Sequence, residues 1–168
     1  IPRPETEHWA KSLLQELGND QRKKIACLDL FAGSGCVGVA ILKHISQAIV
    51  DFGEKDKGLL SQIKTNAEQN RIDRARYSLI HTNVFESITG SYDYIAANPP
   101  YIAEQGEEIQ GSVLKQEPHQ ALFGGKDGLL YIDRFLEEAK GFLNPQGVVY
   151  MEFGSFQKES VEKAIGRR

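Results

Sequence analysis

The sequence has few residues that could cross-link the chain or hold a metal ion. It contains only two cysteines, Cys27 and Cys36, which form no C-x-x-C pair. Its four histidines are scattered, so no cluster has the spacing of metal ligands. We therefore expect no metal and no disulfide framework, and a reducing intracellular compartment fits this cysteine usage best.

Long apolar runs and an excess of positive charge are also missing. No uninterrupted apolar stretch approaches the ~18 residues that a membrane-spanning helix needs. The 20 lysines and arginines are outnumbered by 23 aspartates and glutamates, so the strong positive field that drives non-specific phosphate binding is absent. We expect a soluble monomer with no membrane contact and no direct nucleic acid partner.

What the sequence does contain is a regular alternation of strand and helix patterns. Apolar residues recur at helical spacing in some segments and form short continuous runs in others. The predicted elements are helix 5–17, strand 25–31, helix 36–44, strand 47–53, a helix through 59–67, strands 77–81 and 92–97, a helix around 132–139, strand 147–153 and a closing helix near 161–165. Strands this uniformly apolar predict an α/β fold, a mostly parallel sheet with helices on both faces.

The first strand ends in a glycine turn, "DLFAGSGCVG". Gly33 and Gly35 allow a tight turn, and the next helix offers free N–H groups to an anionic group. The second strand ends at Glu54, where a carboxylate can accept hydrogen bonds from both hydroxyls of a ribose. These features predict a nucleoside cofactor site. Gly33, Gly35 and Gly38 also match G-x-G-x-x-G, so a nicotinamide-dependent oxidoreductase is one alternative.

The fourth strand ends in a rigid polar corner formed by Asn98, Pro99, Pro100 and Tyr101. The two prolines stiffen the backbone and provide no N–H of their own. The Asn98 side-chain oxygen and the Pro99 carbonyl can together accept both hydrogens of an NH2 group, while Tyr101 supplies a flat wall. The corner therefore favours a planar amide or an amino-purine as the substrate.

With both corners and their flanks, the chain resembles the HemK/PrmC family of protein glutamine methyltransferases. The resemblance rests on "DLFAGSG", Glu54 and "NPPY", with "IPRPETE" upstream and "QEPHQALFGGKDGL" downstream. It implies a class I S-adenosylmethionine-dependent methyltransferase with a Rossmann-like sheet. The implied substrate is the glutamine of the Gly-Gly-Gln motif in a peptide chain release factor, methylated on its side-chain amide nitrogen.

The resemblance also implies roles for individual residues. The residues that would contact the methionine part of S-adenosylmethionine are Asp29, Phe31, Ala32, Gly33, Ser34 and Gly35. Glu54 would bind the ribose, and Asn83 and Val84 would flank the adenine. The residues on the substrate side would be Asn98 and Pro99 at the amide, Pro100 and Tyr101 around it, and Pro4 and Thr6 at the mouth of the site.

By the same resemblance, residues 1–168 are one catalytic domain. Residues 1–20 would be a linker and first helix, 25–97 the cofactor-binding half and 98–168 the substrate-binding half. Within the second half, the segment between Tyr101 and Gly128 shows no strong periodicity and is a candidate substrate lid.

The chain departs from the family pattern at several points. Phe31 replaces the usual first glycine and Asn83 replaces an aspartate, although we expect cofactor binding to survive both changes. The N-terminal helical domain and the last antiparallel strands of the family are missing, which would leave a sheet edge exposed unless further residues or a partner cover it.

Two further interpretations remain open at this stage. One is a methyltransferase for exocyclic amino groups of RNA or DNA bases, because NPPY corners also serve such substrates. The other is a truncated, non-catalytic binding domain. We expect a mitochondrial location if the source is eukaryotic and the cytoplasm if it is bacterial.

Overall fold

The computed structural model describes residues 4–103 and 123–166, and the chain divides into two compact units. The first unit comprises Ile1–Asn98 and Gly141–Met151. The second comprises Pro99–Lys140 and Glu152–Arg168. Every strand of the sheet belongs to the first unit.

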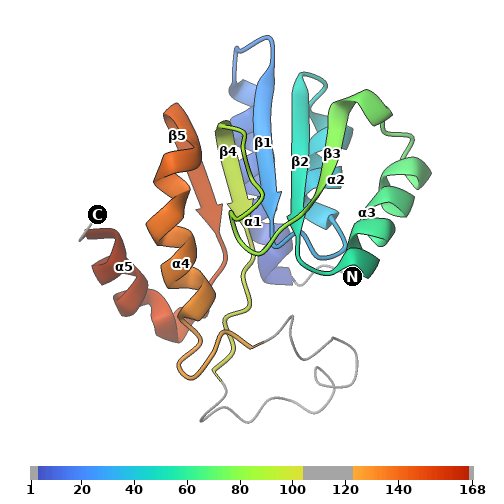
Figure 1. Cartoon of the computed structure of the whole chain (residues 1–168). Helices are drawn as coiled ribbons and strands as arrows, with labels where there is room; N and C mark the ends of the chain where they lie inside the picture. The colour runs from blue at the N-terminus through green and yellow to red at the C-terminus, as the bar shows by residue number, and fades with distance from the viewer. Residues whose placement is uncertain (1–3, 104–122, 167–168) are drawn as a thin grey trace. The chain divides into compact units, whose positions relative to one another are not determined.

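The first unit is built on a five-stranded sheet in the order β3-β2-β1-β4-β5 (Figure 1). All four strand pairings are parallel, which confirms the predicted parallel α/β sheet. The strands are β1 (Ile25–Leu30), β2 (Ala48–Glu54), β3 (Tyr77–His81), β4 (Tyr92–Ala97) and β5 (Leu143–Met151). The strand β4 is buried along its whole length, as its apolar sequence predicts.

Three helices of this unit pack on a common core. They are α1 (Pro4–Asn19), α2 (Cys36–His44) and α3 (Lys57–Gln69), and α2 contacts both of the others. Their buried residues join alternate strand residues in one cluster, to which α1 contributes Leu13 and Leu17 and α3 contributes Ile63 and Ala67. Because strand side chains alternate between the two faces of a sheet, this cluster lies on one face.

The last strand differs from its prediction. It was expected at 147–153, but β5 runs from Leu143 to Met151 with an irregularity after its first residue. Tyr92 of β4 pairs with Leu143 and Tyr94 pairs with Val148, so four residues of β5 lie opposite one residue of β4. The prediction failed because the proline and glycine in this stretch are typical turn signals.

The described part of the second unit contains the helices α4 (Leu130–Glu138) and α5 (Lys158–Gly166), which contact each other. Ile132 and Phe135 of α4 are completely buried, which agrees with the predicted helix around 132–139. The short 3-10 helices among the described residues are η1 (Arg74–Arg76), η3 (Ala139–Phe142) and η4 (Ser155–Gln157). Most of the candidate lid, residues 104–122, lies outside the described residues.

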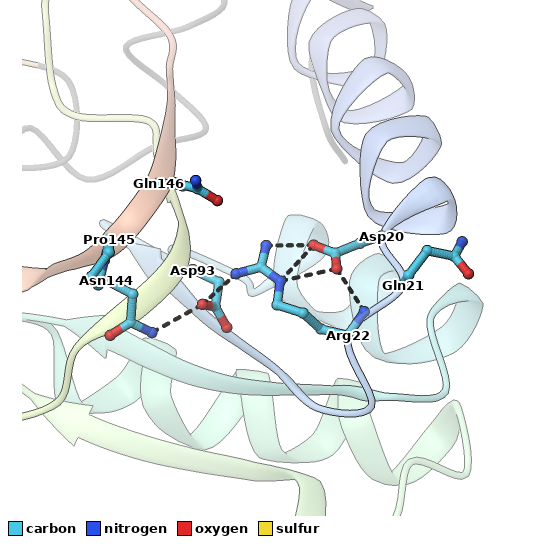
Figure 2. Close-up of a pocket in the computed structure, with 7 residues that line it drawn as sticks. All are labelled: Asp20, Gln21, Arg22, Asp93, Asn144, Pro145 and Gln146. Atoms are coloured by element: carbon cyan, nitrogen blue, oxygen red, sulfur yellow. Dashed lines mark hydrogen bonds and ion pairs between the residues drawn. The ribbon is translucent and has the colours of Figure 1, made fainter.

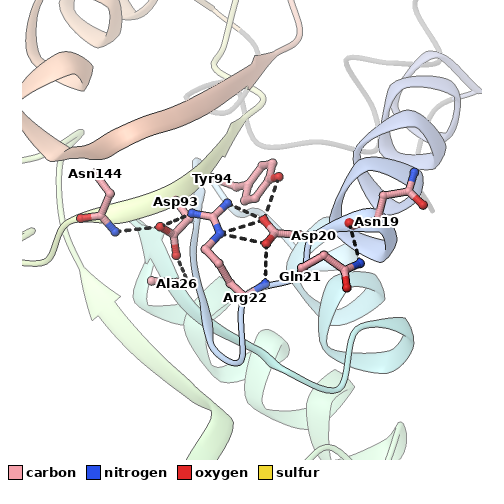
Figure 3. Close-up of polar contacts among 8 residues, drawn as sticks. All are labelled: Asn19, Asp20, Gln21, Arg22, Ala26, Asp93, Tyr94 and Asn144. Carbon is pink, nitrogen blue, oxygen red and sulfur yellow. Dashed lines mark hydrogen bonds and ion pairs between the residues drawn. The ribbon is translucent and has the colours of Figure 1, made fainter.

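A polar network ties the linker between α1 and β1 to β4 and β5 (Figure 3). The guanidinium of Arg22 pairs with the carboxylates of Asp20 and Asp93. Asp93 also accepts hydrogen bonds from the Ala26 backbone N–H at 2.8 Å and from the Asn144 amide at 3.0 Å. The hydrogen bond from Arg22 lowers the pKa of Asp20 to about 2. The network holds the starts of three neighbouring strands together.

Replacing Asp93 with alanine should lower the free energy of unfolding by about 1 to 3 kcal/mol, because it leaves partly buried donors without their acceptor. Urea denaturation would measure the change. Lys64→Ala is the matched control, since the Lys64–Glu68 ion pair is exposed and its loss should cost less than about 1 kcal/mol. Equal effects of the two variants would contradict a structural role for the network.

Candidate functional site

The predicted cofactor residues meet at one edge of the sheet, where the carboxyl ends of four strands lie side by side. Leu30, the last residue of β1, is in register with Gly53 of β2 and Ala97 of β4. Glu54 of β2 is in register with His81, the last residue of β3. The chain order runs outward in opposite directions from β1 and β4, so the ends of these two strands form the switch point where open parallel sheets bind ligands.

The turn after β1 adopts the left-handed backbone that its glycines permit. Gly33 has φ of 56° and Gly35 has φ of 76°, and the Gly35 N–H donates to the Ala32 carbonyl at 2.7 Å. Gly35 caps the N-terminus of α2. The amide of Asn66, on α3, donates to the Ser34 carbonyl at 2.8 Å, a support that sequence reasoning missed because nothing distinguishes Asn66 from other polar helix residues.

Phe31 also has a left-handed backbone, with φ of 58°. It therefore ends the strand one residue earlier than predicted and turns the chain into the glycine loop. A residue with a Cβ is strained in this conformation, which a glycine adopts freely. The departure from the family pattern at Phe31 thus falls at a position whose backbone suits glycine.

Asp29 is a buried carboxylate just before this turn. It is 4% exposed, and its Oδ2 accepts a hydrogen bond from the Gly38 N–H in the first turn of α2 at 2.8 Å. Burial raises the pKa of Asp29 to about 7, the hydrogen bond from Gly38 opposes that rise, and the nearby charge of Glu54 adds to it. A cation bound beside Asp29 would favour its ionised form.

Glu54 is held by backbone N–H groups of the turn after β1 and of the loop after β2. Its Oε2 accepts from Gly33 at 2.8 Å, and its Oε1 accepts from Lys55 at 2.8 Å and Asp56 at 2.9 Å. A carboxylate has about four acceptor positions, so three of them are engaged. These bonds fix the orientation of the group predicted to bind a ribose.

The loop after β3 places Asn83 and Val84 at the same edge. Thr82 shapes the loop, since its hydroxyl donates to the Val84 carbonyl at 2.9 Å and accepts from the Ser87 N–H at 3.0 Å. The Asn83 amide donates to Glu86 at 2.8 Å. The Val84 side chain is 3% exposed, and its φ is 55°. Sequence reasoning named Asn83 and Val84 but missed Thr82.

Asn98 follows β4 directly and lies next to the glycine turn through the pairing of β1 with β4. Its Nδ2 donates to the hydroxyl of Thr6, in the first turn of α1, at 3.3 Å. Among the described residues, no group donates a hydrogen bond to the Asn98 Oδ1. The structure thus brings Thr6 and Asn98 together, although 92 positions separate them in the chain.

The next three residues of the corner, Pro99, Pro100 and Tyr101, belong to the second unit. The Tyr101 hydroxyl donates to Glu152 at 3.3 Å, and its carbonyl accepts from the Gln157 amide at 3.0 Å. A Cβ on Gly128, whose φ is 78°, would lie 2.2 Å from the Tyr101 carbonyl oxygen. The glycine-containing segment that follows the candidate lid therefore packs closely against this part of the corner.

A cavity of about 690 Å³ lies at the opposite edge of the sheet, at the amino ends of the strands (Figure 2). Its lining residues are Asp20, Gln21, Arg22, Asp93, Asn144, Pro145 and Gln146. The charged groups there already pair with one another in the network of Figure 3, which gives the cavity a structural rather than a chemical role.

The described ranges, 4–103 and 123–166, lack the features of two other kinds of site. They contain no group of three or more His, Cys, Asp or Glu side chains placed to hold a metal ion. Within the same ranges, no helix combines the length and apolar character needed to cross a membrane.

Comparison with known proteins agrees with this geometry. Residues 7–163 match the family model described as "Methyltransferase small domain". The chain is 33% identical over 163 residues to the release factor glutamine methyltransferase of Lactococcus lactis subsp. lactis, covering 96% of this chain and 58% of that protein. It is 37% identical over 127 residues to the ribosomal protein uL3 glutamine methyltransferase of Neisseria meningitidis serogroup A, covering 76% of this chain and 42% of that protein.

A solved structure shares the fold. The ribosomal protein L11 methylase of Lactobacillus delbrueckii subsp. bulgaricus superimposes with a TM-score of 0.69 at 18% identity, covering 99% of this chain and 69% of that one. The chain therefore has the fold of the class I methyltransferases. The chain belongs to the methyltransferase small domain family, and it spans little more than half the length of the release factor methyltransferase that it matches.

Gly38→Ala should destabilise the protein by about 1 to 3 kcal/mol. The added Cβ would lie 2.3 Å from Cε1 of Phe52 and 3.0 Å from the Asp29 carboxylate, so α2 would have to move off the sheet. Gly18→Ala is the control, because a Cβ there meets nothing within 4 Å and alanine favours a helix. Thermal unfolding should show opposite shifts; a neutral Gly38→Ala would contradict the close packing.

Stability should depend on the protonation of Asp29. Its pKa of about 7 in the folded protein is above the ordinary value of 3.8, so the folded state binds the proton more tightly and stability falls as pH rises from about 4 to 7. The difference in unfolding free energy between wild type and Asp29→Asn, measured in urea at several pH values, should change over this range by at most about 4 kcal/mol. A constant difference would exclude the raised pKa.

Proposed function

We propose that this chain transfers a methyl group from S-adenosylmethionine to the side-chain amide nitrogen of a glutamine in a protein. The observation that carries the proposal is the position of Asn98, which lies at the end of β4 beside the glycine turn of β1 and is followed by two prolines. This arrangement supports the proposal, because acceptors that could bind an amide would lie next to the strand ends that could bind a nucleoside.

The residues present fit the cofactor. The left-handed turn at Gly33 and Gly35 lets the backbone approach a ligand closely, and the buried Asp29 carboxylate favours a nearby cation. Glu54 would accept a hydrogen bond from one ribose hydroxyl at the acceptor position that its three backbone bonds leave open. When bound, S-adenosylmethionine supplies an electrophilic methyl group on a positively charged sulfur.

The corner would orient the substrate rather than act as a strong base. The Asn98 Oδ1 and the Pro99 carbonyl would accept the two N–H groups of the glutamine amide and direct its nitrogen toward the methyl carbon. The nitrogen would gain the C–N bond as the bond between the methyl carbon and the cofactor's sulfur breaks, leaving that sulfur as a neutral thioether, and the nitrogen would release one proton to solvent. Because positive charge is dispersed in this reaction, alignment contributes most, and positioning can supply ~7 to 11 kcal/mol.

The glutamine of the Gly-Gly-Gln motif of a peptide chain release factor is the proposed substrate. Support comes from the resemblance of the two corners to that family and from the relative in Lactococcus lactis, which is named for this activity. The Neisseria meningitidis relative makes a glutamine of ribosomal protein uL3 the second candidate substrate. Both relatives are bacterial, which favours the bacterial cytoplasm as the compartment.

The test is mass spectrometry of each candidate substrate after incubation with the chain and S-adenosylmethionine. We expect a mass increase of about 14 Da on one glutamine of the release factor, with uL3 unmodified. Asn98→Ala should reduce the rate at least ~100-fold and leave cofactor affinity by calorimetry unchanged, because its oxygen aligns only the substrate. Glu54→Ala should instead weaken cofactor binding.

Each outcome decides a separate point. Methylation of uL3 alone would identify uL3 as the substrate and leave the proposed reaction unchanged. Full turnover by Asn98→Ala would rule out the proposed binding of the substrate amide by Asn98. Unmodified glutamine in both substrates would reject the proposed activity for this chain.

A further inference from the structure

Thr6 is a buried polar residue, although its position at the start of a helix predicts an exposed side chain. It lies in the first turn of α1 between two exposed glutamates, yet it is only 4% exposed. Its hydroxyl oxygen lies 3.3 Å from the Nδ2 of Asn98 and accepts its hydrogen bond. The start of α1 therefore contacts the residue at the end of β4 that the proposed function needs.

The direction of this hydrogen bond has a chemical consequence. An asparagine amide presents an oxygen on one side and an NH2 group on the other, and its terminal torsion is soft and roughly two-fold. In the structure the Nδ2 faces Thr6, which leaves the Oδ1 turned away from Thr6. Without this hydrogen bond, the amide of Asn98 would be free to rotate and present its NH2 group instead.

We propose that Thr6 is a positioning residue that makes Asn98 present its oxygen to the substrate. This inference rests on the proposed function, in which the Asn98 Oδ1 accepts an N–H of the glutamine amide. Thr6 acts through Asn98 and does not touch the reacting atoms.

The same orientation provides discrimination between glutamine and glutamate. An oxygen facing the substrate accepts an N–H from a carboxamide, but it repels the oxygen of a carboxylate of the same shape. An Asn98 amide that rotates freely would offer an N–H to the carboxylate. Loss of the Thr6 hydroxyl should therefore lower turnover of glutamine and also improve binding of glutamate.

The test compares three variants of the full chain on a peptide carrying the Gly-Gly-Gln motif. Thr6→Val keeps the shape and removes the hydroxyl, and it should lower kcat about tenfold, the effect of about 1.4 kcal/mol expected for one neutral hydrogen bond. Cofactor affinity and melting temperature should stay near wild type. Thr6→Ser should recover at least half of the wild-type kcat.

Thr65→Val is the matched control. Thr65 is an exposed helix threonine whose hydroxyl donates to the Ser61 carbonyl at 3.1 Å, away from the strand ends. It should leave every parameter unchanged. A peptide with glutamate in place of the target glutamine supplies the second readout, since it should inhibit Thr6→Val several-fold more strongly than wild type.

A third readout is independent of turnover and separates this inference from the proposed function. The side-chain NH2 resonances of Asn98, assigned by their loss in Asn98→Asp, should shift in Thr6→Val and return toward wild type in Thr6→Ser. Unchanged resonances would overturn the inference whether or not the chain methylates the peptide. Wild-type kcat in Thr6→Val, or equal losses in the valine and serine variants, would also overturn it. Failure of the wild type to methylate, with the resonances shifted as expected, would reject only the proposed function.

Discussion

The pairing of β1 with both β2 and β4 is the constraint on which the site depends. Leu30 is in register with Gly53 on one side and Ala97 on the other, so the residues that follow these strands emerge at the same edge. Parallel pairing fixes this convergence, because the carboxyl ends of all the strands must point the same way. A shift of one residue in the pairing register would also move every side chain of the shifted strand to the opposite face of the sheet.

The sequence was sufficient for the parts of the fold that local patterns encode. The bounds of α2, β3 and β4 were predicted as they occur, because each is a short apolar run or helical repeat between clear stop signals. Most of β5 was placed correctly, but its start at Leu143 was missed. The predicted strand began only at Gly147, whereas Pro145 and Gly147 lie in an irregularity within the observed strand.

The sequence indicated which candidate residues stand at strand ends, and it indicated their supporting contacts less well. The glycine turn, Glu54 and Asn98 stand at strand ends and could be named from position alone. The role of Thr6 toward Asn98 could not, because the contact spans 92 positions and a polar residue at a helix start normally faces water. Asn66 was missed for the same reason: its partner, the Ser34 carbonyl, is 32 positions away and becomes a neighbour only after the helix packs on the sheet.

Two residues with strained backbones show how strongly the surrounding structure determines the loops at the carboxyl ends of the strands. Phe31 and Val84 have φ of 58° and 55°, which costs a residue with a Cβ roughly 1 to 2 kcal/mol. Hydrogen bonds around them hold the conformation: Ala32 donates to Gly53 at 3.2 Å, and Thr82 donates to the Val84 carbonyl at 2.9 Å. Because neighbouring strands fix both loops, Phe31 and Val84 keep a left-handed backbone conformation that a glycine would adopt without strain. The loop after β1 also holds Glu54 in place through the Gly33 N–H, which would reduce the ordering cost of binding a ligand there.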